Sequence, residues 1–438
     1  MQTQQSAIPT TNRLERNITL SLAAVEIESE ITARLKKIAR NAKMPGFRPG
    51  KVPFNIVANQ YGFQVRQEVM SDVVKKSFTQ AVNEQNLRVA GYPRFSPVNT
   101  GQSADKFEFN ATFEIYPDVV IGDLAGQKLI KPEVVVSDSD VDHTLETLRK
   151  QRATYEKVER AAETGDFLTV DFRGTLNGEA FKGGEAQNFG VVIGEKRMLP
   201  DFEQALIGMK AGTKKVFDLT FPTDYQEELA GKTAQFTVSV KEVNAPQFPA
   251  IDTEFAKSLG VEDGDIGKMR AEIKANLDRE LKKRILTKIK DQVMDALIAV
   301  STLDLPRSLV DIEISRLQQA AVKDLEARGM TAKDLSLPPE LFMERAEKRV
   351  RLGLLLNEIV KQNNLKVQPA QIRAVVEDHA ESFEEPQQMV RWYYNQPDRL
   401  AEIEAMVLED NVVEWASAKM NVSMEKSTFD AIMGISRQ

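Results

Sequence analysis

The first 117 residues alternate between strand-like and helix-like patterns of apolar positions. Ile18, Leu20 and Leu22 alternate with polar residues, and the same period of two continues without a break over residues 107–115. This period predicts strands with one buried face. Helical spacing lies between them, in two sets of residues: Ile27, Ile31, Leu35 and Ile38, then Val65, Val69 and Val73. We therefore expect an α+β head over residues 1–117.

Residues 118–160 have the pattern of a connector with structure of its own. The run Val134–Val136 predicts a short strand. A helix is predicted after it, because four apolar residues share one helical face: Val141, Leu145, Leu148 and Tyr155. We expect this segment to be a structured linker.

Residues 161–246 are divided into short apolar runs by glycine. Ten of the 23 glycines fall between Gly165 and Gly231. Four runs read as strands: Phe167–Phe172, Phe189–Ile193, Val216–Phe221 and Phe236–Val243. One short helical stretch lies near Phe202–Ile207. This spacing predicts a small curved antiparallel sheet that wraps a helix.

Residues 247–438 are predicted to be helical throughout. From Met269 to Leu297 an apolar residue recurs at every fourth position. Each step of four residues advances about 400°, so this stripe drifts by about 40° per step around an α-helix. The helix should then meet different neighbours along its length, which favours an extended arm. Pro306 opens a second helix that ends near Gly329, and Pro338-Pro339-Glu340 opens a third.

Composition removes the commonest catalytic chemistries. The 438 residues predict about three domains, and 42% of them are hydrophobic, as in ordinary globular chains. Cysteine is absent, which excludes disulfides, zinc fingers and thiol nucleophiles. His143 and His379 are the only histidines. Both lie among charged residues, so we expect them at the surface and expect no metal site.

Charge is unevenly distributed along the chain. The formal net charge is −7, but residues 1–60 hold nine Lys/Arg and four Asp/Glu, a local +5 that leaves −12 elsewhere. A basic head on an acidic body predicts an anionic partner for the head. The polar start lacks the pattern of a signal peptide, and no apolar run approaches the ~18 residues of a membrane span. We expect a soluble cytoplasmic protein with no membrane partner.

Two stretches have residues suited to binding. The Pro- and Gly-rich loop at 45–53 presents Phe47, Arg48 and Lys51, and Arg and Lys suit phosphate or carboxylate. Alternatively, Phe47 packs back into its own domain. The glycine-rich sheet carries many aromatic residues, which either form its core or line a pocket.

The loop sequence Gly46-Phe47-Arg48-Pro49-Gly50-Lys51-Val52-Pro53 resembles the ribosome-binding signature of the bacterial trigger factor family. The resemblance implies a ribosome-binding domain over 1–117, a linker over 118–160 that packs on the helical domain, and a helical chaperone domain with arms over 247–438. It also implies docking at the exit tunnel of the large ribosomal subunit through Phe47, Arg48 and Lys51. One departure is Pro49, where the family often has a basic residue.

Residues 161–246 resemble an FKBP-type prolyl isomerase domain. The motifs that carry the resemblance are Val170-Asp171-Phe172-Arg173-Gly174, Phe181, Gly183-Gly184, Ile193-Gly194, Pro200-Asp201-Phe202-Glu203, Phe221-Pro222, Tyr225 and Leu229-Ala230-Gly231-Lys232. The resemblance places eight side chains around the substrate proline: Phe172, Phe181, Phe189, Met198, Leu199, Phe202, Tyr225 and Phe236. Small FKBPs have aspartate and tryptophan where this chain has Lys182 and Phe202.

The leading hypothesis is a ribosome-associated chaperone that shields nascent and unfolded polypeptides and isomerises X-Pro bonds without cofactor or ATP. The resemblance also implies a homodimer away from the ribosome. Three alternatives stay open: a free multidomain prolyl isomerase, a scaffold whose isomerase domain only binds proline-containing segments, and a nucleic-acid regulator. The last fits least, because the basic patch is short and lacks interleaved aromatic residues.

Overall fold

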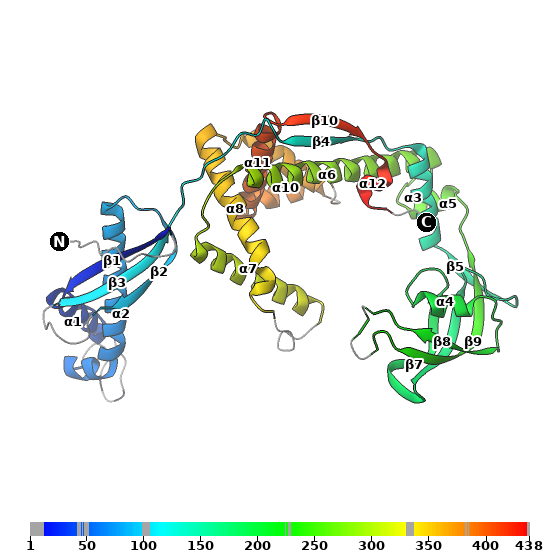
Figure 1. The fold of residues 1–438 in the computed structure, drawn as a ribbon, viewed down its shortest axis with the longest axis horizontal. Coiled ribbons are helices and arrows are strands. Elements are labelled where there is room, and N and C mark those ends of the chain that lie inside the picture. Colours follow the sequence, from blue (N-terminus) through cyan, green and yellow to red (C-terminus); the bar gives the residue numbers. More distant parts are fainter. Residues whose placement is uncertain are drawn as a thin grey trace. The chain divides into compact units, whose positions relative to one another are not determined.

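The computed structural model describes residues 13–41, 45, 47, 52–98, 106–223, 225–226, 229–329, 337–381, 383 and 385–435. The chain divides into two compact units. The first comprises residues 1–131 and 287–424, and the second comprises residues 132–286 and 425–438. Figure 1 shows both units and labels most of their elements.

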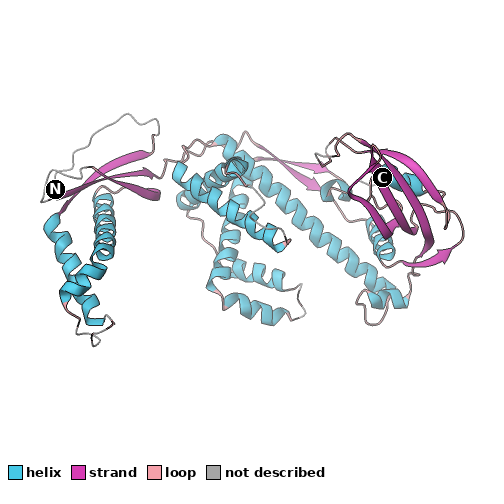
Figure 2. Cartoon of the chain, turned by 90° about the horizontal axis from the view of Figure 1, so that it is seen from below, coloured by secondary structure: helices cyan, strands magenta, loops and turns pink. Residues whose placement is uncertain are grey.

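The amino-terminal part of the first unit, called the head from here on, is a sheet with helices on one side (Figure 2). Its elements are β1 (Glu15–Ala23), α1 (Ala24–Asn41), α2 (Phe54–Glu84), β2 (Val89–Pro97) and β3 (Lys106–Ile115). The strands pair antiparallel in the order β1-β3-β2. Both helices and the sheet contribute to one buried core, which includes Ile27, Val69 and Phe113. The strands and helices expected from the periodicity are confirmed, and β2 adds a strand that was not predicted.

Most of the described residues from 307 to 417 in the first unit are helical. Its helices include α7 (Arg307–Ala327), α8 (Glu340–Asn363), α9 (Pro369–Ala380), α10 (Pro386–Tyr394) and α11 (Pro397–Ser417). Each begins at a proline or directly after one, because the fixed φ of proline and its missing N–H suit a first helical turn. Val310 and Ile314 of α7 pack with Ala346 of α8, and Val376 of α9 packs with Val407 of α11.

The long helix α6 (Ile266–Val300) confirms the drifting apolar stripe. Its first half places Met269, Ile273 and Leu281 in one buried cluster, which belongs to the second unit. Its second half places Val293 and Leu297 in another, which belongs to the first unit. One helix therefore serves two cores, as the 40° drift per four residues predicts.

The second unit contains the predicted antiparallel sheet wrapped on a helix. The elements are β5 (Thr154–Val158), β6 (Phe167–Leu176), β7 (Glu179–Val192), α4 (Pro200–Leu206), β8 (Lys214–Thr220) and β9 (Thr233–Gln247). The strand order is β5-β9-β6-β7, and β8 pairs with β9. Phe202 and Leu206 of α4 are buried against Leu168, Val170 and Val238 of the sheet.

A second core in this unit joins segments far apart in the sequence. The shorter helices are α3 (Asp138–Gln151), α5 (Thr253–Ser258) and α12 (Phe429–Met433). Val141 and Leu145 of α3 pack with Phe255 of α5 and with Phe429 and Ile432 of α12. Side-chain caps begin α3, α5 and α12, at Ser137, Asp252 and Thr428.

Three predictions about elements were wrong. Val134–Val136 is not a strand, because β4 (Lys128–Glu133) ends before it and Val136 is buried in the core of the second unit. Tyr155 lies in β5, since α3 ends at Gln151. The carboxy-terminal zone is not helical throughout, because β10 (Asn421–Lys426) pairs with β4. That partner is distant in the sequence, so local periodicity does not reveal the pairing.

Candidate functional site

Aromatic rings from separate elements of the second unit form one connected group. Phe172 of β6 lies with its ring centroid 5.4 Å from that of Phe202 of α4, and Phe202 lies 5.6 Å from Phe236 of β9. From β7, Phe189 lies 5.6 Å from Phe172 and Phe181 lies 6.1 Å from Phe236. These four pairs meet edge to face, an arrangement that the ring quadrupoles favour.

The group continues from Phe181 to the loop after β8. Phe181 lies 5.9 Å from Phe221, and Phe221 lies 5.0 Å from Tyr225. Met198 and Leu199 are partly buried against the same core. We call the whole set of rings the aromatic cluster: Phe172, Phe181, Phe189, Phe202, Phe217, Phe221, Tyr225 and Phe236. The structure thus brings together all eight residues singled out in the sequence, the six rings within the aromatic cluster and Met198 and Leu199 beside it.

Exposure is graded across the aromatic cluster. Phe202 is only 1% exposed and Phe236 only 6% exposed, so these rings form the inner floor. Phe189 is 38% exposed and Tyr225 is 42% exposed, so the cluster reaches the surface at these two rings. A ligand that approaches there meets apolar rings with a rigid, buried support beneath them.

Two glycines allow the rings to approach the sheet closely. A Cβ atom at Gly174 would lie 2.7 Å from Phe236 and 3.0 Å from Phe181, closer than packed atoms tolerate. A Cβ atom at Gly184 would lie 2.9 Å from Phe181. Both positions are buried in strands, where glycine often marks such an approach.

A polar network holds the backbone next to Phe189. The carboxylate of Asp171 accepts a hydrogen bond from the Asn188 backbone N–H at 2.7 Å and pairs with the Lys241 Nζ at 2.8 Å. Lys241 also donates to the Asn188 side chain at 2.6 Å. The bond from Lys241, with that from Asn188, lowers the pKa of Asp171 below its ordinary value. Asn188 has a φ of 51°, a left-handed conformation that this network supports.

The chemistry available at the aromatic cluster is binding and desolvation. Its side chains are hydrocarbon except for the Tyr225 hydroxyl. The neighbouring Met198 adds a thioether. Among the described residues, no group of three or more His, Asp or Glu is arranged to hold a metal ion. His143 is exposed, as expected, whereas His379 is half-buried beside Tyr393. Neither is in the aromatic cluster.

Sequence reasoning missed Phe217 and did not assign Phe221 to the site. Phe217 stacks against Phe236 with ring centroids 6.1 Å apart and lies opposite it in the β8–β9 register. Phe217, Leu219 and Phe221 occupy alternate positions along one stretch of chain. That alternation was the available signal, since alternate residues of a strand share a face.

In the Pro- and Gly-rich loop of the head, the structure describes Phe47 as 38% exposed. Arg48 and Lys51, the other two predicted contacts, lie outside the described residues.

Family models match most of the chain in three consecutive parts. Residues 2–148 match a model described as bacterial trigger factor protein, and residues 265–418 match its C-terminus. Residues 158–241, which hold the aromatic cluster, match FKBP-type peptidyl-prolyl cis-trans isomerase.

Full-length relatives decide the assignment. The trigger factor of Azoarcus sp. (strain BH72) is 50% identical over 435 residues and covers 99% of both chains. That of Nitrosospira multiformis is 49% identical over 432 residues, 98% of this chain and 99% of its own. The chain belongs to the trigger factor family. A solved structure described as "Promiscuous Substrate Recognition in Folding and Assembly Activities of the Trigger Factor Chaperone" covers 96% of this chain and 100% of its own, at 18% identity and a TM-score of 0.45.

Membership in the trigger factor family confirms the chaperone and isomerase parts of the leading hypothesis. The protein is a ribosome-associated chaperone that binds nascent chains and has an FKBP-type peptidyl-prolyl isomerase domain. The free isomerase is therefore not favoured. None of the helices that the structure describes is long and apolar enough to cross a bilayer.

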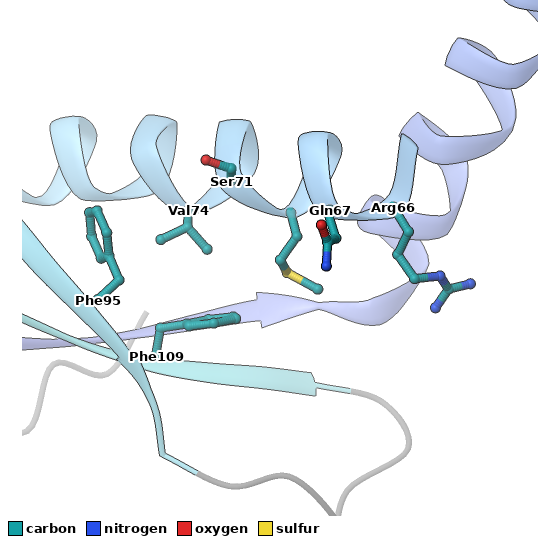
Figure 3. A pocket seen from close by; sticks show the side chains of 7 residues that line it. Arg66, Gln67, Ser71, Val74, Phe95 and Phe109 are labelled. Atoms are coloured by element: carbon teal, nitrogen blue, oxygen red, sulfur yellow. The ribbon is translucent and has the colours of Figure 1, made fainter. Parts of the chain in front are cut away.

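The head has an apolar depression of its own. It has a volume of about 380 Å³ and lies between α2 and the sheet, where Phe95 and Phe109 face Val74 of the helix (Figure 3). Met70 also lines it. Arg66 lies at its edge and pairs with Glu28 at 2.8 Å. The head therefore has a surface hollow whose lining does not include Phe47.

Proposed function

We propose that X-Pro isomerisation takes place at the exposed side of the aromatic cluster. The residues that would surround the substrate proline are those inferred from the sequence: Phe172, Phe181, Phe189, Met198, Leu199, Phe202, Tyr225 and Phe236. The connected rings, buried at Phe202 and exposed at Phe189 and Tyr225, support this assignment.

The reaction suits a hydrocarbon site. The barrier to rotation about a peptide bond is about 18–20 kcal/mol and comes from amide resonance. No nucleophile or proton donor is needed to cross it. A site that grips the proline ring and removes water from the amide favours the twisted form, whose resonance is reduced. The aromatic cluster offers rigid rings for the first task and an apolar environment for the second.

Substitution of an exposed ring tests this placement. Because Phe189 is 38% exposed, Phe189→Ala leaves most of the core intact and should lower kcat/KM for X-Pro peptides by about tenfold or more. Phe63→Ala in the head is the matched control, since Phe63 is also exposed and belongs to a different element. Full activity in Phe189→Ala would contradict the assignment.

A substitution at the buried floor of the aromatic cluster tests the alternative that the domain binds proline-containing segments without catalysis. Phe202→Ala removes the ring that touches Phe172, Phe217 and Phe236. An active isomerase should lose most of its catalysis on this substitution. If neither the wild type nor Phe202→Ala accelerates peptide isomerisation, the chain is a proline-binding scaffold.

We further propose that the head docks at the exit tunnel of the large ribosomal subunit through Phe47, Arg48 and Lys51. The exposure of Phe47 and the local +5 charge of residues 1–60 support an interaction with ribosomal RNA or acidic protein surfaces. As the family resemblance implies, we also propose a cytoplasmic location, a homodimer away from the ribosome, independence from cofactors and a four-segment division at residues 117, 160 and 246.

Co-sedimentation with ribosomes in moderate salt tests the docking site. The Phe47→Ala, Arg48→Ala, Lys51→Ala variant should stay in the supernatant while the wild type sediments. A triple variant in α2 that also removes one phenylalanine and two positive charges is the control: Phe63→Ala, Lys75→Ala and Lys76→Ala. Equal loss in both variants would show that net charge, rather than the loop, directs binding. Higher salt should weaken the wild-type interaction, because exposed charges are screened.

A further inference from the structure

A buried carboxylate lies directly behind the aromatic cluster. Glu203 follows Phe202 in α4 and is only 5% exposed. Burial of a charged group is unfavourable unless hydrogen bonds compensate it. The contacts of Glu203 therefore indicate what the carboxylate does.

Glu203 accepts hydrogen bonds from the backbone of the segment between β7 and α4. Its Oε2 accepts from the Gly194 N–H at 2.8 Å and from the Lys196 N–H at 3.4 Å. Its Oε1 accepts from the Met198 N–H at 3.1 Å. One side chain thus fixes three alternate backbone positions within five residues. Hydrogen bonds to an ionised acceptor are stronger than those between neutral groups.

The backbone of residues 194–198 needs these hydrogen bonds to keep its conformation. Gly194 has a φ of 97° and Lys196 a φ of 57°, both in the left-handed region. Glycine adopts this region freely, but a residue with a Cβ does so only at a cost. A Cβ atom at Gly194 would also lie 2.8 Å from the side chain of Thr164. The segment therefore has a specific conformation that its own local preferences do not secure.

The same segment carries two residues of the proposed site. Met198 and Leu199 pack against the core that contains the aromatic cluster. The Leu199 carbonyl accepts the backbone N–H of Phe202 at 2.9 Å and that of Glu203 at 3.2 Å. The first turn of α4, which carries the floor ring Phe202, is thus bonded to residues 194–199 in two ways. The backbone N–H groups of Phe202 and Glu203 donate to the Leu199 carbonyl, and the Glu203 carboxylate accepts from backbone N–H groups of the segment.

We propose that Glu203 is a positioning residue for prolyl isomerisation, whose carboxylate holds Met198 and Leu199 in place beside the aromatic cluster. This inference rests on the proposed location of the isomerase site. Glu203 does not touch the substrate in this scheme. Glu203 sets the position of Met198 and Leu199. The buried rings that would bind the proline ring do not depend on it.

Glu203→Gln in the full-length chain tests the inference. Glutamine keeps the size of the side chain but removes the charge and turns an NH₂ group toward backbone donors. We expect kcat for X-Pro peptides to fall about tenfold. KM should change much less, because the rings of the floor are untouched. In NMR spectra, the Gly194 and Met198 amide protons should shift and lose exchange protection. Glu195→Gln is the control, since Glu195 lies in the same segment but is exposed and pairs with Arg197.

A double-mutant cycle separates positioning from a general effect on folding. If Glu203 acts through Met198 and Leu199, then Glu203→Gln should have little further effect on kcat in a Met198→Ala, Leu199→Ala background. An additional tenfold loss in that background would overturn the inference, as would a wild-type kcat in Glu203→Gln. If Phe189→Ala is inactive while Glu203→Gln is fully active, only the role of Glu203 is wrong. If Phe189→Ala is fully active, the proposed site itself is wrong.

Discussion

Gly174 illustrates how a single residue position controls the geometry of the aromatic cluster. The strand at this point passes so close to Phe236 and Phe181 that only a hydrogen atom fits. Both rings also contact other members of the aromatic cluster, so neither ring is free to move alone. Glycine usually weakens a strand, and here its benefit is the close approach.

Gly174→Ala should therefore lower both stability and isomerase activity. Insertion of a methyl group into a packed core typically costs about 1–3 kcal/mol, which denaturant unfolding would measure. Gly62→Ala in α2 is the control, because the space around Gly62 is open among the described residues. That substitution should leave activity unchanged and stabilise the helix by up to about 1 kcal/mol. An unperturbed Gly174→Ala protein would contradict the close approach.

The Asp171 network predicts that the stability of the folded state depends on pH. The folded state lowers the pKa of Asp171 through its bonds with Lys241 and Asn188. Its contribution to stability is therefore present above the unfolded pKa, about 3.9 for aspartate, and is lost as the pH falls through the lowered folded value.

Asp171→Asn should be less stable than the wild type at pH 7, and this difference should narrow as the pH falls below about 4. Thermal unfolding from pH 7 to pH 2.5 measures it. Glu179→Gln, which alters an exposed carboxylate on β7, should show a much smaller difference over the whole range. A constant Asp171→Asn difference down to pH 2.5 would rule out the ion pair as its cause.

At the scale of elements, α7 begins with a cap supplied by the head sheet. Pro306 precedes the helix and has no side-chain acceptor, so its first N–H groups need another partner. Glu114 of β3 accepts from the Arg307 N–H at 3.1 Å and from the Ser308 N–H at 2.6 Å. Ser308 in turn donates its hydroxyl to the Ala90 carbonyl of β2 at 2.9 Å. A carboxylate at this end also suits the helix dipole.

Glu114→Gln should destabilise the first unit by about 1–2 kcal/mol, the usual range for loss of a helix cap. Hydrogen exchange at the start of α7 is the direct measurement, and protection there should fall more than in α9. Glu340→Gln is the control, because Glu340 lies exposed in the first turn of α8. If both substitutions leave exchange at residues 307–310 unchanged, the cap contributes nothing.

Sequence patterns predicted the elements whose formation depends on local periodicity. β3 and α6 have long uninterrupted patterns, and both were found. β2 was missed because Gly91, Pro93 and Pro97 interrupt its alternating pattern. Its pairing with β3 stabilises it as a strand, although its own sequence has a weak strand signal. β10 was missed because its partner β4 is remote. The aromatic residues of the site followed from a family resemblance, whereas Glu203 required the fold, since only the fold places its carboxylate among backbone donors.

At the scale of the whole molecule, α6 contributes to two separate cores. Leu281 is buried with Val141 and Phe255 in the second unit, and Val293 is buried with Leu129 and Ile359 in the first. The two residues lie on one continuous helix, but their surroundings differ completely. Each should therefore stabilise its own unit more than the other.

Leu281→Ala should reduce exchange protection mainly within residues 132–286, and Val293→Ala mainly within residues 287–424. Truncation of a buried leucine costs about 2–5 kcal/mol, and that of a valine costs less. Hydrogen exchange measured by mass spectrometry over the full chain distinguishes the two. Equal loss across both units in either variant would mean that the chain unfolds as one cooperative body.

The core formed by α3, α5 and α12 also affects the biosynthesis of the protein. Phe429 and Ile432 complete a cluster whose other members, such as Val141, are synthesised far earlier. Contacts between residues so distant in the sequence form only after the intervening chain exists. While its own translation is in progress, this chaperone therefore exposes an apolar surface on α3, as its clients do. Phe429 and Ile432 cover that surface only once they have been synthesised, so a chain truncated before residue 429 should itself need protection from aggregation.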